Sequence, residues 1–90
     1  MQPKLTEKEK LIVNTISIVL KELRMESSKS QRMLAFEFGL HKSLISRLES
    51  ASNSPFLLSV WKVAESIGMK PSEFIALVEN KLPNDFKLID

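Results

Sequence analysis

The chain has 90 residues, enough for one small domain, since a second would need on the order of another 100 residues. With 43% hydrophobic and 27% charged residues, its composition is that of a globular protein. It contains no cysteine, which excludes a disulfide framework, a thiol nucleophile and a cysteine-built zinc site. Its single histidine offers no histidine cluster for a metal and no set of histidine, nucleophile and acid, which argues against enzyme chemistry. We therefore expect a protein that is not an enzyme and holds no metal or cofactor.

The net charge of +2 is concentrated in the middle of the chain. Residues 29–50 carry four basic and two acidic side chains (+2), residues 1–28 five and four (+1), and residues 51–90 four and five (−1). A basic middle segment is the distribution expected of a nucleic-acid-binding protein. No apolar run approaches the roughly 18 residues of a membrane span, and no signal-peptide pattern opens the chain, so we expect a soluble, cytoplasmic protein.

The first half of the sequence predicts two helices. Thr6 opens a capping box, and an apolar stripe continues from there to about Met25. Ser30 is a suitable N-cap for a short second helix through Phe38, and Gly39 supplies the left-handed residue that ends it. The side chains expected to face the core are Ile12, Ile16, Val19, Leu20 and Leu23 in the first helix and Leu34, Ala35 and Phe38 in the second.

Three more helices are expected. The third covers about Lys42–Ser50, the fourth begins at Pro55 and closes at Gly68, and the fifth opens at Pro71 and stops at Pro83. The side chains expected to face the core are Ile45 and Leu48, then Leu57, Val60, Trp61, Ala64 and Ile67, then Phe74, Leu77 and Val78.

The sequence therefore predicts an all-α fold of five helices in a single domain over residues 1–90. We place its core at about residues 12–80, with an N-terminal extension of the first helix at 6–11 and a short tail at 82–90.

Only three residues separate the second and third predicted helices, which forces a sharp crossing and is typical of a helix-turn-helix. The polar face of the third helix matches that purpose. Arg47 can bond guanine O6 and N7 together, Lys42 can reach guanine or a phosphate, and Ser43 and Ser46 suit either. We expect Leu44 on the same outer face, where it can meet a thymine methyl group.

The stretch reads Ser30-Gln31-x-x-Leu34-Ala35-x-x-Phe38-Gly39-Leu40-x-Lys42-Ser43-x-Ile45-Ser46-Arg47-Leu48-Glu49. It resembles the helix-turn-helix core of the Cro/phage-repressor (XRE) family, and the similarity extends from Leu20 to Phe74. The resemblance implies a compact, repressor-like domain of five helices that binds DNA, usually as a dimer on a two-fold operator.

The resemblance also implies roles for individual residues. It places base contacts at Lys42, Ser43 and Arg47, with Ser46 and Leu44 close by. It further implies an ion pair between Arg24 of the first helix and Glu49 of the third. The residues expected to contact phosphates are Gln31, Lys29, Arg32, His41, Ser52, Asn53 and Ser54.

Several positions depart from the family pattern. Ser28 and Lys29 stand where a glycine and an aliphatic residue are usual, and His41 replaces a serine-like helix cap. Ala51 replaces the glycine after the third helix; because a left-handed alanine costs about 1 kcal/mol, we expect that turn to differ.

The apolar residues exceed what one small core buries. The surplus consists of Leu11, Val13, Ile18, Met25, Met33 and Phe36. Such residues often mark contacts, so one interpretation is a dimer interface on the first helix. The other is that the tail, with Phe86, Leu88 and Ile89, folds back and covers them.

These observations predict a dimeric, sequence-specific transcriptional regulator of bacterial or phage type. Its partners would be double-stranded DNA, a second copy of the chain and, as a further option, a polymerase or a toxin, with no small-molecule effector domain. One alternative is an antitoxin or a restriction–modification controller with autoregulatory DNA binding. A second alternative is an all-α protein-interaction adaptor whose basic helix never meets DNA.

Overall fold

The computed structural model describes residues 4–52 and 54–89, and all structural statements concern those residues. Within them the chain forms five α-helices and no strand, so the all-α prediction is confirmed. The helices are α1 (Glu7–Glu26), α2 (Gln31–Phe38), α3 (Lys42–Ser50), α4 (Leu57–Ser66) and α5 (Pro71–Lys81). None of these helices is both long enough and apolar enough to cross a membrane.

Local sequence signals set the ends of α1 and α2. The Thr6 hydroxyl accepts from the backbone N–H of Glu9 at 3.2 Å, and the Glu9 carboxylate accepts from the backbone N–H of Thr6 at 2.8 Å. The Ser30 hydroxyl caps α2 by accepting from the backbone N–H three residues later, at 3.1 Å. Gly39 then ends α2 with a φ of 65°, which glycine adopts at no steric cost.

The connections around α3 and α4 differ from two expectations. Ala51 has a φ of 54° and a ψ of 32°, so it adopts the left-handed turn that a glycine usually fills, and the expectation of a different turn is wrong. The fourth helix begins at Leu57 rather than at Pro55, with Phe56 as its N-cap. Pro71 opens α5 as predicted, because proline lacks only an N–H that the first turn leaves unpaired.

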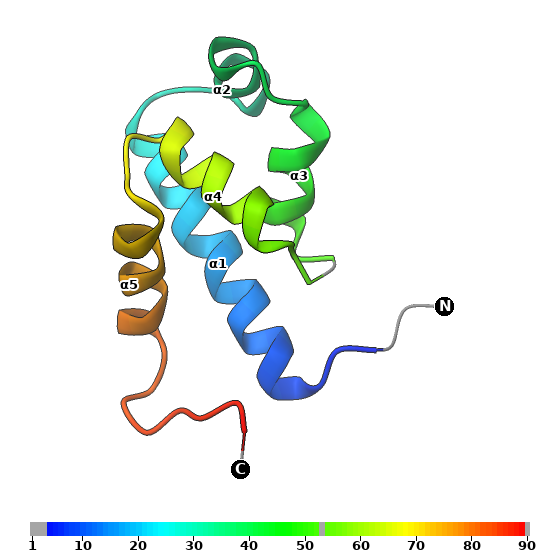
Figure 1. Ribbon diagram of the computed structural model, residues 1–90, viewed down its shortest axis with the longest axis vertical. Helices are drawn as coiled ribbons and strands as arrows, with labels where there is room; N and C mark the ends of the chain where they lie inside the picture. The colour runs from blue at the N-terminus through cyan, green and yellow to red at the C-terminus, as the bar shows by residue number, and fades with distance from the viewer. Residues whose placement is uncertain (1–3, 53, 90) are drawn as a thin grey trace.

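The long helix α1 organises the fold by packing against both α3 and α5. Helix α2 packs against α3 and α4, and α4 packs against α5. In Figure 1, α4 crosses in front of α1, and α2 lies at the end of the molecule opposite the described chain ends. The largest fully buried side chains are Phe74, Leu20, Leu34, Ile45, Val19 and Val63.

Three side chains expected in the core lie at the surface instead. Phe38 is 49% exposed, Leu57 69% and Trp61 47%. In α4 the buried face runs through Val60, Val63 and Ala64. The helix is apolar on more than one side, and its contacts with α2 and α5 select the stripe that contains Val63.

The tail does not cover the surplus apolar side chains. Val13 is buried in α1, but the other five, which are Leu11, Ile18, Met25, Met33 and Phe36, remain exposed. The tail residue Phe86 is half-buried, whereas Leu88 and Ile89 are exposed. Of the two interpretations of these residues, the one in which the tail covers them is therefore wrong for these five.

Candidate nucleic-acid interface

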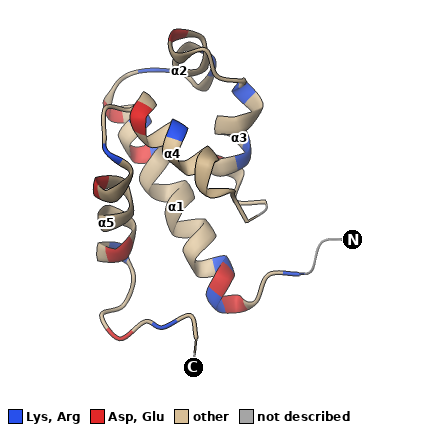
Figure 2. Ribbon diagram, viewed as in Figure 1, with Lys and Arg blue, Asp and Glu red and all other residues tan. Residues whose placement is uncertain are grey.

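Helices α2 and α3 form a helix-turn-helix. Residues 39–41 connect them, and the two helices pack directly against one another. Ile45 and Leu48 fix α3 to the core, with 0% and 6% exposure. Because one face of α3 is anchored in this way, its opposite face is held at the molecular surface, where Figure 2 shows Lys and Arg on α3.

Three predicted base-contact residues project from that outer face. Lys42 and Ser43 in the first turn are exposed, and so is Arg47 one turn later. Ser46 is half-buried, and its hydroxyl donates to the Ser43 carbonyl at 3.2 Å. Leu44 does not lie on the outer face as expected: it is half-buried and packs against the core.

The residues expected at phosphates fall into two groups. Arg32, His41, Ser52 and Ser54 are exposed, and the Ser52 hydroxyl lies 3.1 Å from that of Ser50 at the end of α3. Asn53 lies outside the described residues.

The second group is already engaged inside the protein. Gln31 Nε2 donates to Glu49 Oε1 at 3.1 Å, and Lys29 Nζ lies 2.6 Å from Glu37 Oε2 and 5.8 Å from the centre of the Phe38 ring. A phosphate contact by either side chain would compete with these interactions.

The ion pair expected between Arg24 and Glu49 is present. Arg24 Nε donates to Glu49 Oε2 at 2.6 Å and Nη2 donates to Oε1 at 2.9 Å, while Nη1 donates to the Lys29 carbonyl at 2.8 Å. The Glu49 side chain is 3% exposed and that of Arg24 is 14% exposed. The pair therefore ties α1 to the last turn of α3, the helix that carries the candidate site.

Burial and pairing act in opposite directions on the ionisation of Glu49. Burial raises the pKa of its carboxyl group, but hydrogen bonds from Arg24 and Gln31 and the charges of Arg24 and Lys21 outweigh burial, so the net pKa is lowered. The carboxylate raises the pKa of Arg24 above its ordinary value in turn. Both groups are thus charged at neutral pH.

Sequence reasoning missed one further residue of this network. The buried hydroxyl of Ser17 in α1 donates to the backbone carbonyl of Glu49, which supplies one of the last carbonyls of α3 with a partner. A serine on the inner face of a helix gives no periodic signal. Only the packing of α1 against α3 makes its role visible.

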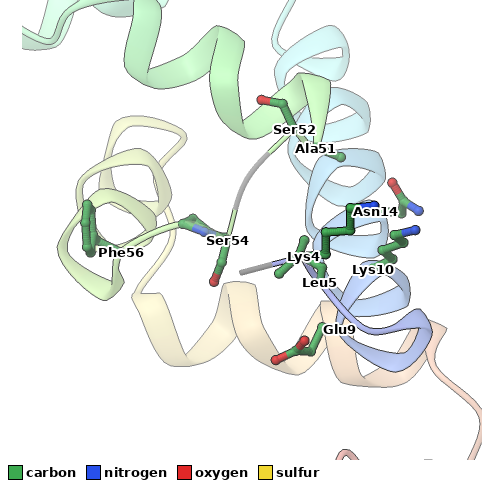
Figure 3. A pocket seen from close by; sticks show the side chains of 10 residues that line it. Lys4, Leu5, Glu9, Lys10, Asn14, Ala51, Ser52, Ser54 and Phe56 are labelled. Atoms are coloured by element: carbon green, nitrogen blue, oxygen red, sulfur yellow. The ribbon is translucent and has the colours of Figure 1, made fainter. Parts of the chain in front are cut away.

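A groove beside the predicted phosphate loop was also not anticipated. It has a volume of about 810 Å³ and lies between the start of α1 and the connection from α3 to α4. Figure 3 shows Lys4 and Lys10 on one wall and Phe56 on the other, with Ser54 between them. Two cations outside the helix-turn-helix thus lie close to the loop expected to meet phosphates.

No group of three or more His, Asp or Glu side chains that could hold a metal ion occurs in the parts of the chain that the structure describes. The exposed polar side chains of α3 are instead the cations Lys42 and Arg47 and the hydroxyls of Ser43 and Ser50. These are the groups that proteins use to contact base edges and phosphates.

Comparison of the sequence with known proteins gives a family match and two relatives. Residues 20–74 match the helix-turn-helix family HTH_3. The chain is 29% identical over 69 residues to the HTH-type transcriptional regulator SutR of Escherichia coli (strain K12). The aligned stretch covers 77% of this chain and 39% of SutR. It is 30% identical over 57 residues to the Control protein C.BamHI of Bacillus amyloliquefaciens. That aligned stretch covers 62% of this chain and 70% of C.BamHI.

Two solved structures resemble the fold. An HTH_3 family transcriptional regulator from Vibrio cholerae matches with a TM-score of 0.67 and 26% identity, over 76% of this chain and 38% of that protein. A mutant of the restriction–modification controller protein C.Esp1396I matches with a TM-score of 0.67 and 22% identity, over 77% of this chain and 87% of that protein. The present chain thus spans about two fifths of the length of SutR and of the Vibrio cholerae regulator.

Proposed function

Because this chain belongs to the helix-turn-helix family HTH_3, as its Cro/phage-repressor resemblance predicted, we propose that it is a sequence-specific DNA-binding transcriptional regulator. The observation that carries the proposal is the geometry of α3. Ile45 and Leu48 fix one side of this helix in the core, while Lys42, Ser43 and Arg47 project from the other.

In the proposed mechanism α3 enters the major groove. Arg47 donates to guanine O6 and N7, and Lys42 and Ser43 contact bases near the start of the helix. Arg32, His41 and the exposed Ser52 and Ser54 contact phosphates on either side. Bound protein then blocks or recruits polymerase, and the role assigned to the chain is binding rather than catalysis.

We further propose that the protein acts in the cytoplasm as a homodimer on an operator with two-fold symmetry. Two copies related by a two-fold axis present two α3 helices to one side of the duplex. Half-sites about 34 Å apart, one helical turn of DNA, would then be contacted together. Binding to both half-sites gives an affinity that neither half-site gives alone.

A restriction–modification controller is the second candidate. It is favoured by 30% identity to the Control protein C.BamHI over 70% of that protein's length. The DNA-binding mechanism is the same in both cases. The two functions differ in the genes controlled, so neighbouring methylase and nuclease genes would identify a controller.

Selection of bound duplexes from a random pool tests the proposal. We expect an enriched sequence with two-fold symmetry. Fluorescence anisotropy with that duplex should show affinity that falls steeply as salt rises, because each neutralised phosphate releases counterions. Absence of salt-dependent binding to any duplex at low salt would overturn the proposal and support a protein-interaction adaptor.

A further inference from the structure

The groove beside the end of α3 has polar walls. It has a volume of about 810 Å³ and is bounded by the chain before α1, the first turns of α1 and the connection from α3 to α4. Because a water molecule occupies about 30 Å³ in the liquid, the groove has room for a sugar–phosphate unit with water around it. The lining side chains that can donate hydrogen bonds are Lys4, Lys10, Asn14, Ser52 and Ser54.

The wall formed by α1 presents two of these donors on one face. Lys10 and Asn14 are four residues apart, which places them one above the other on the same side of the helix. Both side chains are exposed, and Figure 3 shows them close to Lys4 and to Ala51, the residue that ends α3. The side of α1 that faces the end of α3 therefore carries cations and an amide.

The two lysines of the groove are available to a new partner. Lys4 forms no ion pair among the described residues. Lys10 Nζ lies 3.4 Å from Glu7 Oε1, but the two side chains are 54% and 91% exposed, so this pair is weak. The acid in the lining, Glu9, is occupied, because its carboxylate accepts from the backbone N–H of Thr6 at the positive end of α1. The groove thus keeps an excess of positive charge.

We propose that this groove binds phosphodiester groups of the DNA strand that flanks the bases contacted by α3; this rests on the proposed function. Lys4 and Lys10 each neutralise one phosphate, and the Asn14 amide donates to a phosphate oxygen. Such contacts are independent of sequence, but they fix the register and orientation of a protein on the duplex. The first helix, outside the helix-turn-helix, would in this way help to position α3.

The groove continues directly from the surface of α3. The Ser50 hydroxyl in the last turn of α3 donates to the carbonyl of Arg47 at 3.0 Å and lies 3.1 Å from the hydroxyl of Ser52. Ser52 is also part of the groove wall. A strand that continues past Arg47 toward the end of α3 thus reaches Ser52 and then the groove. Figure 2 shows the chain before α1 on the same side of the molecule as the cations of α3.

The engagement of other expected phosphate contacts supports this assignment. Gln31 donates to Glu49, and Lys29 is paired with a carboxylate of α2, so both would have to leave a partner in order to meet a phosphate. The groove offers its cations without breaking any buried contact. Phosphate contacts are therefore expected from the start of α1 more than from the start of α2.

Salt dependence measures how many phosphates the groove contacts. We would compare wild type with the double variant Lys4→Gln/Lys10→Gln. The matched control is Lys70→Gln/Lys87→Gln, which removes the same charge from exposed positions at the start of α5 and in the tail. Helix α5 lies on the other side of α1 from α3 in Figure 1. Fluorescence anisotropy gives the affinity for a duplex that carries one half-site with flanking base pairs, between about 50 and 200 mM salt.

The groove variant should lose salt dependence. Its slope of log affinity against log salt concentration should be smaller by about 1.8, because each contacted phosphate contributes about 0.9. Wild type should therefore lose about tenfold more affinity than the double variant over this range of salt. The control should match wild type, and so should Lys4→Arg/Lys10→Arg, which keeps both charges. A wild-type slope in the double variant, or an equal loss of slope in the control, would overturn the proposal.

Neutral phosphate analogues locate the contact on the DNA. A methylphosphonate replaces one charged phosphate at a time in the strand that flanks the half-site. We expect one or two of these replacements to weaken binding by wild type but not by Lys10→Gln, because the partner cation is already absent; the two effects are then non-additive. Phosphates contacted by Arg32 should stay sensitive in this variant. Additive effects at every position would contradict the assignment of the groove.

The same measurements separate this inference from the function on which it rests. If wild type binds the duplex with a steep salt dependence but the groove variants change neither the slope nor the pattern of sensitive phosphates, only the groove proposal fails. If wild type binds no duplex even at low salt, the proposed function fails, and the groove proposal with it. Lys4 and Lys10 are exposed, so both variants should retain the circular dichroism spectrum and the urea midpoint of wild type.

Discussion

Two hydrogen bonds join Arg24 of α1 to Glu49 at the end of α3, from Nε at 2.6 Å and from Nη2 at 2.9 Å. The carboxylate also accepts from Gln31 at the start of α2. One buried acid in the last turn of α3, the helix that carries the candidate site, thus contacts two other helices, α1 and α2. Such a pair adds little net stability, but it fixes the position of α3.

Removal of the charge on Glu49 tests this arrangement. Glu49→Gln should lower the free energy of unfolding by about 3 kcal/mol, because Arg24 is then left buried without a countercharge. Urea denaturation measures the change. The matched control is Glu37→Gln, which breaks the more exposed pair with Lys29 and should cost less than about 1 kcal/mol. Equal losses in the two variants would contradict a special role for Glu49.

The lowered pKa of Glu49 predicts how stability depends on pH. Between the pKa of Glu49 in the folded protein and its higher value in the unfolded chain, the unfolded state binds more protons, so stability rises with pH. The contribution of Glu49 is complete above the unfolded value and is lost as pH falls through the folded value. Urea denaturation across the acidic range should therefore show a steeper pH dependence for wild type than for Glu49→Gln. Parallel curves would be inconsistent with the pKa shift.

Two arginines should affect DNA binding in different ways. Arg47→Ala should cost about 1–3 kcal/mol on the selected operator and relax the preference at one base position, because it removes a bidentate contact to guanine. Arg32→Ala should weaken binding to all sequences alike. It should also reduce the slope of log affinity against log salt concentration by about one, because one phosphate contact is lost. Anisotropy titrations against single-base operator variants measure both effects. A uniform loss for Arg47→Ala would refute its role in reading bases.

The left-handed conformation of Ala51 predicts a stabilising substitution. Ala51→Gly should raise the free energy of unfolding by about 1 kcal/mol, since glycine adopts a φ of 54° without the clash of a Cβ atom. Ala76→Gly is the control, because Ala76 is an exposed residue inside α5 where glycine should cost about 1 kcal/mol. Thermal or urea denaturation should thus give shifts of opposite sign, and loss of stability in both variants would count against the strain at Ala51.

Local signals in the sequence predicted most of the helix ends. Thr6, Ser30, Gly39 and Pro71 act on the backbone of their own turn, so their effect does not depend on the rest of the fold. At Ala51 the family's turn persists although the residue has changed. The two helices that flank this turn are each packed elsewhere, α3 against α1 and α2 and α4 against α2 and α5, so the chain between them adopts that turn at the expense of the local preference of alanine.

The buried face of α4 was predicted only in part: Val60 and Ala64 are buried as expected, whereas Leu57 and Trp61 are exposed and Val63 is buried instead. Both the stripe with Leu57 and Trp61 and the stripe with Val63 have helical spacing. Periodicity cannot choose between two apolar stripes on one helix, because the choice depends on where neighbouring helices lie. The hydrogen bond of Ser17 to Glu49 was missed for a related reason, since it joins residues that are distant in the sequence.

Helix α3 is secured unequally at its two ends. Arg24, Gln31 and Ser17 all bind Glu49, whereas His41 provides no side-chain cap at the start of the helix. Small rocking motions of α3 about its fixed end grow with distance from that end, so Arg47 should move least and Lys42 most. Nucleotides opposite Arg47 should then tolerate the least variation among natural operators. Nucleotides opposite Lys42 should tolerate more variation, so the sequence preference should weaken from the base opposite Arg47 toward the base opposite Lys42.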